Sequence, residues 1–175
     1  MSVQVSYGNL EGLRAVLGTT ASIQPAKVDG DADARQAARD WCQKADELHD
    51  SAEYAAAIAA YDTAIGLYRT LENVTDEDRN DLAGAYMNRG NAKPSAPGHG
   101  GLAVLADYDR AIALMEELRR TLGEEWPVPW RNELAAAYMN RGTAKQSAAG
   151  HGEALPDHQT AQDLLSAWCW REEAA

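Results

Sequence analysis

Apolar side chains recur at helical spacing along most of the chain. Within residues 57–71 they fall three and four positions apart, on one face of a helix: Ala57, Tyr61, Ala64, Ile65, Tyr68 and Leu71. A second stripe of this kind runs through residues 104–122: Val104, Tyr108, Ala111, Ile112, Met115, Leu118 and Leu122. A third is expected to face inward near the C-terminus: Ala161, Leu164, Leu165 and Trp168. These stripes and the frequent alanines favour closely packed helices and predict an all-α fold.

Two stretches of the chain repeat each other. Residues 79–93 read RNDLAGAYMNRGNAK, residues 131–145 read RNELAAAYMNRGTAK, and 12 of the 15 positions are identical. The tripeptide GHG recurs at 98–100 and 150–152, at the same offset of 52 residues. Further on, residues 107–112 align with residues 157–162 once two residues are dropped from the later turn. The chain therefore contains copies of one structural unit.

A glycine sits inside the first helix of each of these two copies, at Gly90 and at Gly142. Glycine within a helix costs about 1 kcal/mol relative to alanine. A helix tolerates this cost where another helix must approach closely. Each copy is therefore predicted to be a pair of packed helices, and stacking of the pairs supplies the core.

An arginine in each copy, Arg89 and Arg141, falls at a position inside the helix pair. A buried guanidinium needs a partner. Aspartates recur at the facing place on the second helix, so we expect ion pairs Arg89–Asp107 and Arg141–Asp157.

The pattern within each copy resembles the tetratricopeptide repeat family, whose signature is W-x2-L-G-x2-Y followed by A-x3-F over 34 residues. The resemblance covers roughly residues 38–170, and the YMNRG and DYDRAI segments look like bacterial members. The matching positions are Trp41, Lys44, Ala45, Leu48, Ala57 and Tyr61 in copy one, Tyr86, Arg89, Gly90, Lys93, Val104 and Tyr108 in copy two, and Tyr138, Arg141, Gly142, Lys145, Ala154 and His158 in copy three. The resemblance implies a right-handed solenoid of about three antiparallel helix pairs, at about 38–71, 83–118 and 135–168, in a domain spanning 37–175.

The copies are longer than the family's unit. Trp41 and Tyr86 are 45 residues apart, and Tyr86 and Tyr138 are 52 apart. We interpret the excess as extended second helices, each followed by a loop and an early helix start. Thr75 with Asp78 predicts an N-cap, and a further helix is expected to begin near Trp130, after two prolines.

Residues 1–36 form a separate N-terminal segment in this interpretation. Residues 7–17 could make a short helix with Leu10, Leu13, Val16 and Leu17 inward, and residues 19–36 read as a linker. The segment buries little apolar area, so it is expected to be partly disordered.

Candidate binding residues follow from the resemblance, because the first helix of each pair lines a concave groove that commonly holds an extended peptide. Asn88, Asn140 and Gln43 occupy matching groove positions. An amide offers both a donor and an acceptor, so a ladder of amides can pair with successive peptide units. The neighbouring groove positions are Asp46, Met87, Asn91, Met139 and Thr143. The alternatives are that the asparagines bridge helices or meet solvent, and that the methionines belong to the core.

Charge and composition narrow the function. The net charge of −11 argues against nucleic acid, whose phosphates need excess Lys and Arg, and disfavours anionic membranes. Cys42 and Cys169 are far apart and in no metal-like spacing, and no signal peptide or membrane span is seen, so we expect reduced thiols and a cytoplasmic protein. The histidines at 99 and 151 fall in the GHG turns, one repeat apart and without partner ligands, so no metal site is expected.

The sequence offers no phosphate loop, metal-binding HExxH pair, nucleophile elbow or Cys-His constellation. We therefore expect no enzyme activity and no cofactor. The favoured hypothesis is an adaptor that binds a peptide or partner protein in a groove. The alternatives are a scaffold that associates with itself as a homo-oligomer, and a regulatory subunit of a bacterial effector enzyme such as a CHAT-type protease.

Overall fold

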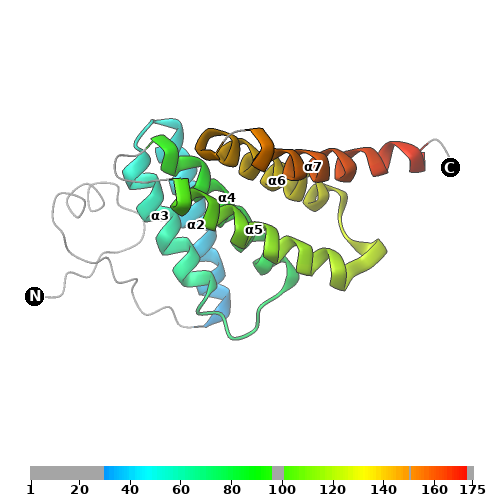
Figure 1. Ribbon diagram of the computed structural model, residues 1–175. Coiled ribbons are helices and arrows are strands. Elements are labelled where there is room, and N and C mark those ends of the chain that lie inside the picture. Colours follow the sequence, from blue (N-terminus) through cyan, green and yellow to red (C-terminus); the bar gives the residue numbers. More distant parts are fainter. Residues whose placement is uncertain (1–29, 96–100, 150, 173–175) are drawn as a thin grey trace, which may run out of the picture. The chain divides into compact units, whose positions relative to one another are not determined.

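A computed structural model describes residues 30–95, 101–149 and 151–172 of the chain (Figure 1). Within these residues the protein is all-α, as the sequence predicts. Its α-helices are α2 (Asp31–Asp50), α3 (Tyr54–Tyr68), α4 (Asp76–Ala92), α5 (Gly101–Leu122), α6 (Val128–Ala149) and α7 (His151–Glu172). Two short 3₁₀ turns follow α4 and α5: η1 (Lys93–Ser95) and η2 (Gly123–Glu125).

The described helices pack as sequential antiparallel pairs, α2 with α3, α4 with α5, and α6 with α7. The described residues divide into two compact units, one ending at Val74 and the other beginning at Thr75. The division falls in the loop between α3 and α4, inside the segment 37–175 that the sequence analysis treats as one repeat domain.

The first unit is built on the α2–α3 pair. Small side chains such as Ala38 and Ala57 are fully buried, which lets the two helices approach closely, and the predicted stripe from Ala57 to Leu71 is buried. The Tyr61 hydroxyl donates a hydrogen bond to the Asp46 carboxylate across the pair.

The helix α2 begins at Asp31, so residues 31–36 are helical and not the linker that the composition suggested. The Asp31 carboxylate explains this start, because it accepts the backbone N–H groups of Glu72 at 2.9 Å and of Asn73 at 2.7 Å. The hydrogen bond from Glu72, and after it the one from Asn73, holds the pKa of Asp31 below its usual range. The first turn of α2 is thereby tied to the loop that follows α3.

The second unit begins with the predicted N-cap. Thr75 and Asp78 form a capping box, in which the Thr75 hydroxyl accepts the Asp78 N–H and the Asp78 carboxylate accepts the Thr75 N–H. The expected extension of the preceding helix is not found, because α3 ends at Tyr68 and the chain turns where Asp31 holds Glu72 and Asn73. The extra residues of copy one thus form a loop and an early start of α4.

The extra residues of copy two do extend a helix, since α5 continues to Leu122. Gly123 then adopts a positive φ of 55°, a conformation that glycine takes without strain. The next helix, α6, begins at Val128, with Pro129 in its first turn, close to the start expected near Trp130.

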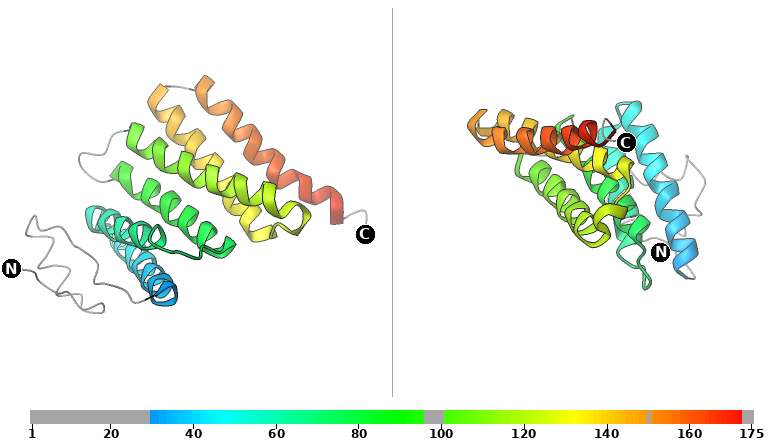
Figure 2. Two further views of the ribbon diagram at one scale, coloured as in Figure 1. Left: turned by 90° about the horizontal axis from the view of Figure 1, so that it is seen from below. Right: turned by 90° about the vertical axis from the view of Figure 1, so that its right-hand side faces the viewer.

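The described residues of this second unit form four α-helices. They lie side by side in chain order, α4 to α7, as the left view of Figure 2 shows. The predicted stripe of α5 is buried from Val104 to Leu118, and Leu122 at its end is half-buried. In α7, Ala161 and Leu164 are buried, but Leu165 is 46% exposed, so its predicted inward position is wrong. Of the described helices only α6 packs extensively on α7, which leaves the Leu165 face uncovered. The side chain of Trp168 lies outside the described residues.

Gly90 and Gly142 both mark close helix approaches, as predicted. A Cβ added to Gly90 would lie 2.9 Å from Cε1 of Tyr108, and one added to Gly142 would lie 2.5 Å from Cδ2 and Nε2 of His158. The helix pairs α4–α5 and α6–α7 thus use the same device at equivalent positions. None of the described helices combines the length and the apolar character needed to cross a membrane.

Candidate functional site

Buried ion pairs fix the two helices of each pair in the second unit. Arg89 on α4 donates to both oxygens of Asp107 on α5, from Nε at 2.9 Å and from Nη2 at 2.5 Å. The Lys93 ammonium lies 2.6 Å from the same carboxylate, which is fully buried. The predicted Arg89–Asp107 pair is therefore confirmed, with Lys93 as a further partner.

The next helix pair repeats this arrangement. Arg141 on α6 donates to Asp157 on α7 at 2.9 and 2.6 Å, and Lys145 lies 3.0 Å from it. Burial by itself would raise the pKa of Asp157, but the hydrogen bonds from Arg141 and Lys145 hold it below its usual range. Arg141 also donates to Asp109 on α5 at 2.7 Å, so it links the two pairs to each other. These contacts orient α4 and α6, which carry most of the candidate binding residues.

An amide pair joins α4 to α6. Asn140 Nδ2 donates to Asn91 Oδ1 at 3.1 Å, and the Tyr108 hydroxyl of α5 donates to the same oxygen at 2.8 Å. Burial, with a contribution from Asp107, raises the pKa of Tyr108 to about 12, so the phenol remains a neutral donor. Two of the predicted residues, Asn91 and Asn140, are thus brought together, in the bridging role that the sequence analysis had weighed as an alternative to ligand binding.

A pocket of about 470 Å³ opens beside this amide pair. Its described lining is uncharged and drawn from η1 and the adjoining ends of α5 and α6: Pro94, Val104, Tyr108, Asn140, Thr143, Ala144, Ser147 and Ala148. Small side chains on α6 leave this space open, and Val104 and the Tyr108 ring give it an apolar floor. Pockets with apolar walls and a few placed polar groups are typical of ligand sites.

A second link between α4 and α6 lies nearer their N-terminal ends. Asn80 Nδ2 donates to Glu133 Oε2 at 3.0 Å. Burial raises the pKa of Glu133, the bond from Asn80 opposes this, and the neighbouring charge of Asp81 raises the pKa further. We call the line along which α4 faces α6, from Asn80 and Glu133 to Asn91 and Asn140, the α4–α6 seam. Its end at Asn80 and Glu133 is acidic, whereas the described residues at its pocket end are uncharged.

The other predicted residues of the second unit occupy varied environments. Met87 and Asn88 on α4 are half-buried, and Met139 on α6 is 38% exposed. The hydroxyl of Thr143, which is exposed and lines the pocket, donates to the Met139 carbonyl of its own helix at 3.0 Å. Asn140 and Thr143 are thus the predicted residues that line the pocket.

The two candidates of the first unit lie on α2. Gln43 is exposed, and its amide lies 3.5 Å from the Glu47 carboxylate one turn later. Asp46 accepts the bond from Tyr61, which gives it a structural role inside the α2–α3 pair.

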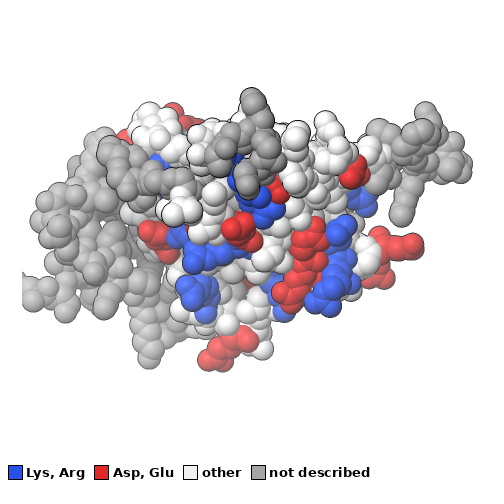
Figure 3. All heavy atoms as spheres, in the orientation of Figure 1, with Lys and Arg blue, Asp and Glu red and all other residues white. Residues whose placement is uncertain are grey.

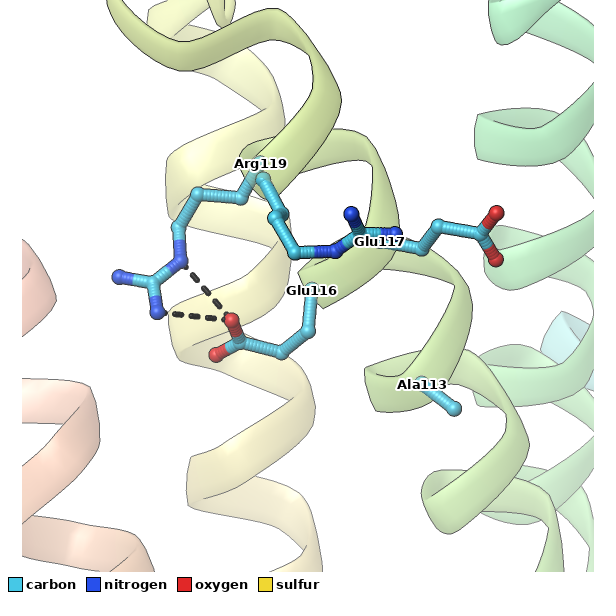
Figure 4. A pocket seen from close by; sticks show the side chains of 5 residues that line it. Ala113, Glu116, Glu117 and Arg119 are labelled. Atoms are coloured by element: carbon cyan, nitrogen blue, oxygen red, sulfur yellow. Dashed lines mark hydrogen bonds and ion pairs between the residues drawn. The ribbon is translucent and has the colours of Figure 1, made fainter.

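A shallow hollow of about 680 Å³ lies along α5 (Figure 4), lined by Ala113, Glu116, Glu117, Arg119 and Arg120. One of its basic side chains is paired: Arg119 lies 2.8 Å from Glu116, which also accepts the Tyr138 hydroxyl at 3.1 Å. Acidic and basic side chains are likewise interspersed on the face that Figure 3 shows. A shallow hollow whose described lining comes from one helix is a poor candidate for a ligand site.

The described residues contain no group of three or more His, Cys, Asp or Glu that could hold a metal ion. Cys42, on α2, is half-buried and not in a disulfide. His99 and the side chains of His151 and Cys169 lie outside what the structure describes.

Sequence reasoning missed several residues of the seam. Tyr108 was assigned to the core stripe, and its ring is indeed buried, but its hydroxyl reaches the amide pair. The acidic end of the seam could have been found from the sequence, because Asp81 and Glu133 are acidic residues at equivalent positions of the two copies. Small residues such as Ala144 and Ser147 carried none, since only the approach of α5 and α6 makes them a lining.

No protein-family model matches the sequence, and no curated protein matches it either.

Proposed function

We propose that this protein is a tetratricopeptide-like interaction module, a right-handed solenoid of helix pairs that binds an extended segment of another polypeptide along the α4–α6 seam. The repeated sequence, the interior glycines and the sequential helix pairs support this assignment. In this proposal the protein is a cytoplasmic adaptor without catalytic activity of its own.

One observation carries the proposal: the hydrogen-bonded pair of Asn91 and Asn140 borders an uncharged pocket. Within the described residues, Asn140 Oδ1 accepts no hydrogen bond and Asn91 Nδ2 donates none. The pair therefore keeps one acceptor and one donor group for a ligand. A peptide unit offers the complementary N–H and C=O, whatever its side chains are.

The Tyr108 hydroxyl and the Asn140 amide both donate to Asn91 Oδ1, which fixes the orientation of the Asn91 side chain. Its Nδ2 group then faces away from these donors. A preorganised donor loses little side-chain entropy when a ligand binds, which favours affinity. The small walls at Ala144 and Ala148 leave room for a ligand side chain next to the bound peptide unit.

A selection from a random dodecapeptide display library against the full chain tests this proposal. Selected peptides are then measured by fluorescence anisotropy against Ser147→Trp, which fills the pocket. Ser166→Trp is the matched control, because Ser147 and Ser166 are both exposed and both hydroxyls donate to a carbonyl of their own helix. We expect Ser147→Trp to weaken binding at least tenfold and Ser166→Trp to leave it unchanged. Equal affinities for the two variants would contradict binding in this pocket.

Self-association is a second candidate, favoured by the exposed apolar face of α7. Leu165 is 46% exposed, whereas Met115 at the aligned position of α5 is 2% exposed. Sedimentation equilibrium of the wild type and of Leu165→Ser distinguishes the self-associating scaffold from the peptide-binding adaptor. A dimer that dissociates in the variant supports a scaffold, and a monomer in both proteins excludes association through this face.

A further inference from the structure

The two ends of the α4–α6 seam differ in chemistry, and both ends are crossed by a hydrogen bond between the same two helices. One is the amide pair Asn91–Asn140, beside the uncharged pocket, and the other is the Asn80–Glu133 bond, beside Asp81. Because α5 packs against both α4 and α6, it covers one side of the seam. A ligand that lies along the other side meets both ends.

We infer that the segment bound along this seam carries an apolar side chain for the pocket and a lysine or arginine three to five residues away, facing Glu133 and Asp81. The inference rests on the proposed function and adds the chemistry of the partner. The pocket gives the place of binding, and the two carboxylates select the charge of the occupant.

The spacing follows from helix geometry. Asn80 and Asn91 are 11 residues apart on α4, and Glu133 and Asn140 are 7 apart on α6. At about 1.5 Å per residue these separations are roughly 16 and 10 Å. An extended peptide advances about 3.3 Å per residue, so roughly three to five residues cover the distance.

The charge preference follows from the surroundings of Glu133. Within the described residues its Oε2 accepts the Asn80 amide, while its Oε1 accepts no hydrogen bond, and Asp81 lies close enough to repel its charge. A cationic side chain at this point would relieve the repulsion between the two carboxylates. The overall charge of −11 would also attract a basic partner at long range.

The preference for an apolar side chain follows from the pocket. Its described lining, which includes Val104, Ala144, Ala148 and the Tyr108 ring, contains no charged group, so a charged side chain placed there would lose its hydration without compensation. An apolar side chain such as Val matches this lining, and the pocket leaves room for backbone beside Asn140.

A defined peptide series tests the inference. Fluorescein-labelled eleven-residue peptides of Gly and Ser carry one Val and one Lys, separated by one to eight residues, and companion peptides carry Glu or Gln in place of Lys. Anisotropy is recorded with protein up to millimolar concentration. We expect the tightest binding at separations of three to five, at least a tenfold loss when Glu replaces Lys, and a steeper salt dependence for the Lys peptides than for the Gln peptides.

The variant Glu133→Gln identifies the selecting group. It should bring the affinity ratio of Lys to Gln peptides close to one. Glu117→Gln, an exposed glutamate on α5, is the control and should keep the wild-type ratio. A further readout is pH: the preference for Lys should fade as Glu133 becomes protonated.

The outcomes separate this inference from the proposed function. Peptides that bind in a Ser147→Trp-sensitive manner but show no preference for Lys overturn the inference and leave the peptide-binding function intact. A Lys preference that survives Glu133→Gln overturns the assignment to this carboxylate. No binding of either this series or the display-selected peptides overturns both.

Discussion

Replacing Asp107 with Asn perturbs the centre of the α4–α5 pair while keeping the volume of the side chain. The Asp107 carboxylate is fully buried and faces Arg89, Lys93 and Arg110, whose nearest nitrogens lie at 2.5, 2.6 and 3.6 Å. Arg89 and Lys93 are themselves only 11% exposed. The variant therefore removes a negative charge that these two shielded cations share.

The magnitude follows from the burial of the charges that remain. Breaking a buried ion pair by removing one partner typically costs about 3–5 kcal/mol, because the other charge stays buried without compensation. The neighbouring Asp109 offers a control on the same helix, since its pair with Arg141 is 59% exposed on the aspartate side. Exposed pairs contribute about 0–1 kcal/mol, so Asp109→Asn should have a small effect.

Urea unfolding followed by far-UV circular dichroism measures both variants. With a slope of about 2 kcal/mol/M, a loss of about 4 kcal/mol lowers the midpoint by about 2 M. Hydrogen exchange then locates the loss, which should appear at the amides of α4 and α5. Replacing the three residues with apolar side chains (Arg89→Met, Lys93→Met and Asp107→Leu together) should recover most of the stability, because none of these three charges then remains buried. A loss below 1 kcal/mol for Asp107→Asn, equal to that of Asp109→Asn, would refute the reasoning.

Further predictions concern the helices around the seam. Gly90→Ala should lower the melting temperature because its Cβ would lie 2.9 Å from the Tyr108 ring, whereas Gly84→Ala on the same helix meets no atom within 4 Å and should raise stability by up to about 1 kcal/mol. Thr75→Ala should cost about 1 kcal/mol in urea unfolding through loss of the capping box, and an unchanged midpoint would contradict that role. Burial raises the pKa of Glu133, so the folded state binds its proton more tightly than the unfolded state and this group lowers stability as pH rises above about 4. Glu133→Gln should therefore stabilise the protein at pH 7 and have no effect below about pH 4 in thermal melts at both pH values.

The helix pairing could be predicted because each element of it recurs in the sequence. Arg89 and Arg141 stand at one position of the repeat and Asp107 and Asp157 at the facing one, so a single rule gave two confirmed ion pairs. The interior glycines and the Thr75 cap are local signals of the same kind.

Features that depend on distant contacts could not be predicted in this way. The start of α2 is held by hydrogen bonds that the Asp31 carboxylate accepts from residues more than 40 positions away. The spacing of apolar residues along the chain gives no information on such contacts. The pocket is lined by residues of three elements, and its existence depends on how closely α5 and α6 approach. Leu165 fits the spacing of an inward stripe, yet it is exposed. The reason is that, among the described helices, only α6 packs extensively on α7.

The location of a bound peptide is the most direct test of the proposed function. Side-chain amide signals of the asparagines can be followed by ¹H–¹⁵N NMR during titration with a peptide from the display selection. Saturable shifts of the Asn91 and Asn140 Nδ2 signals are expected, while that of Asn132, an exposed asparagine on α6 outside the pocket lining, should stay unchanged. Saturable binding that leaves the Asn91 and Asn140 signals in place would contradict the assignment of the α4–α6 seam as the binding site.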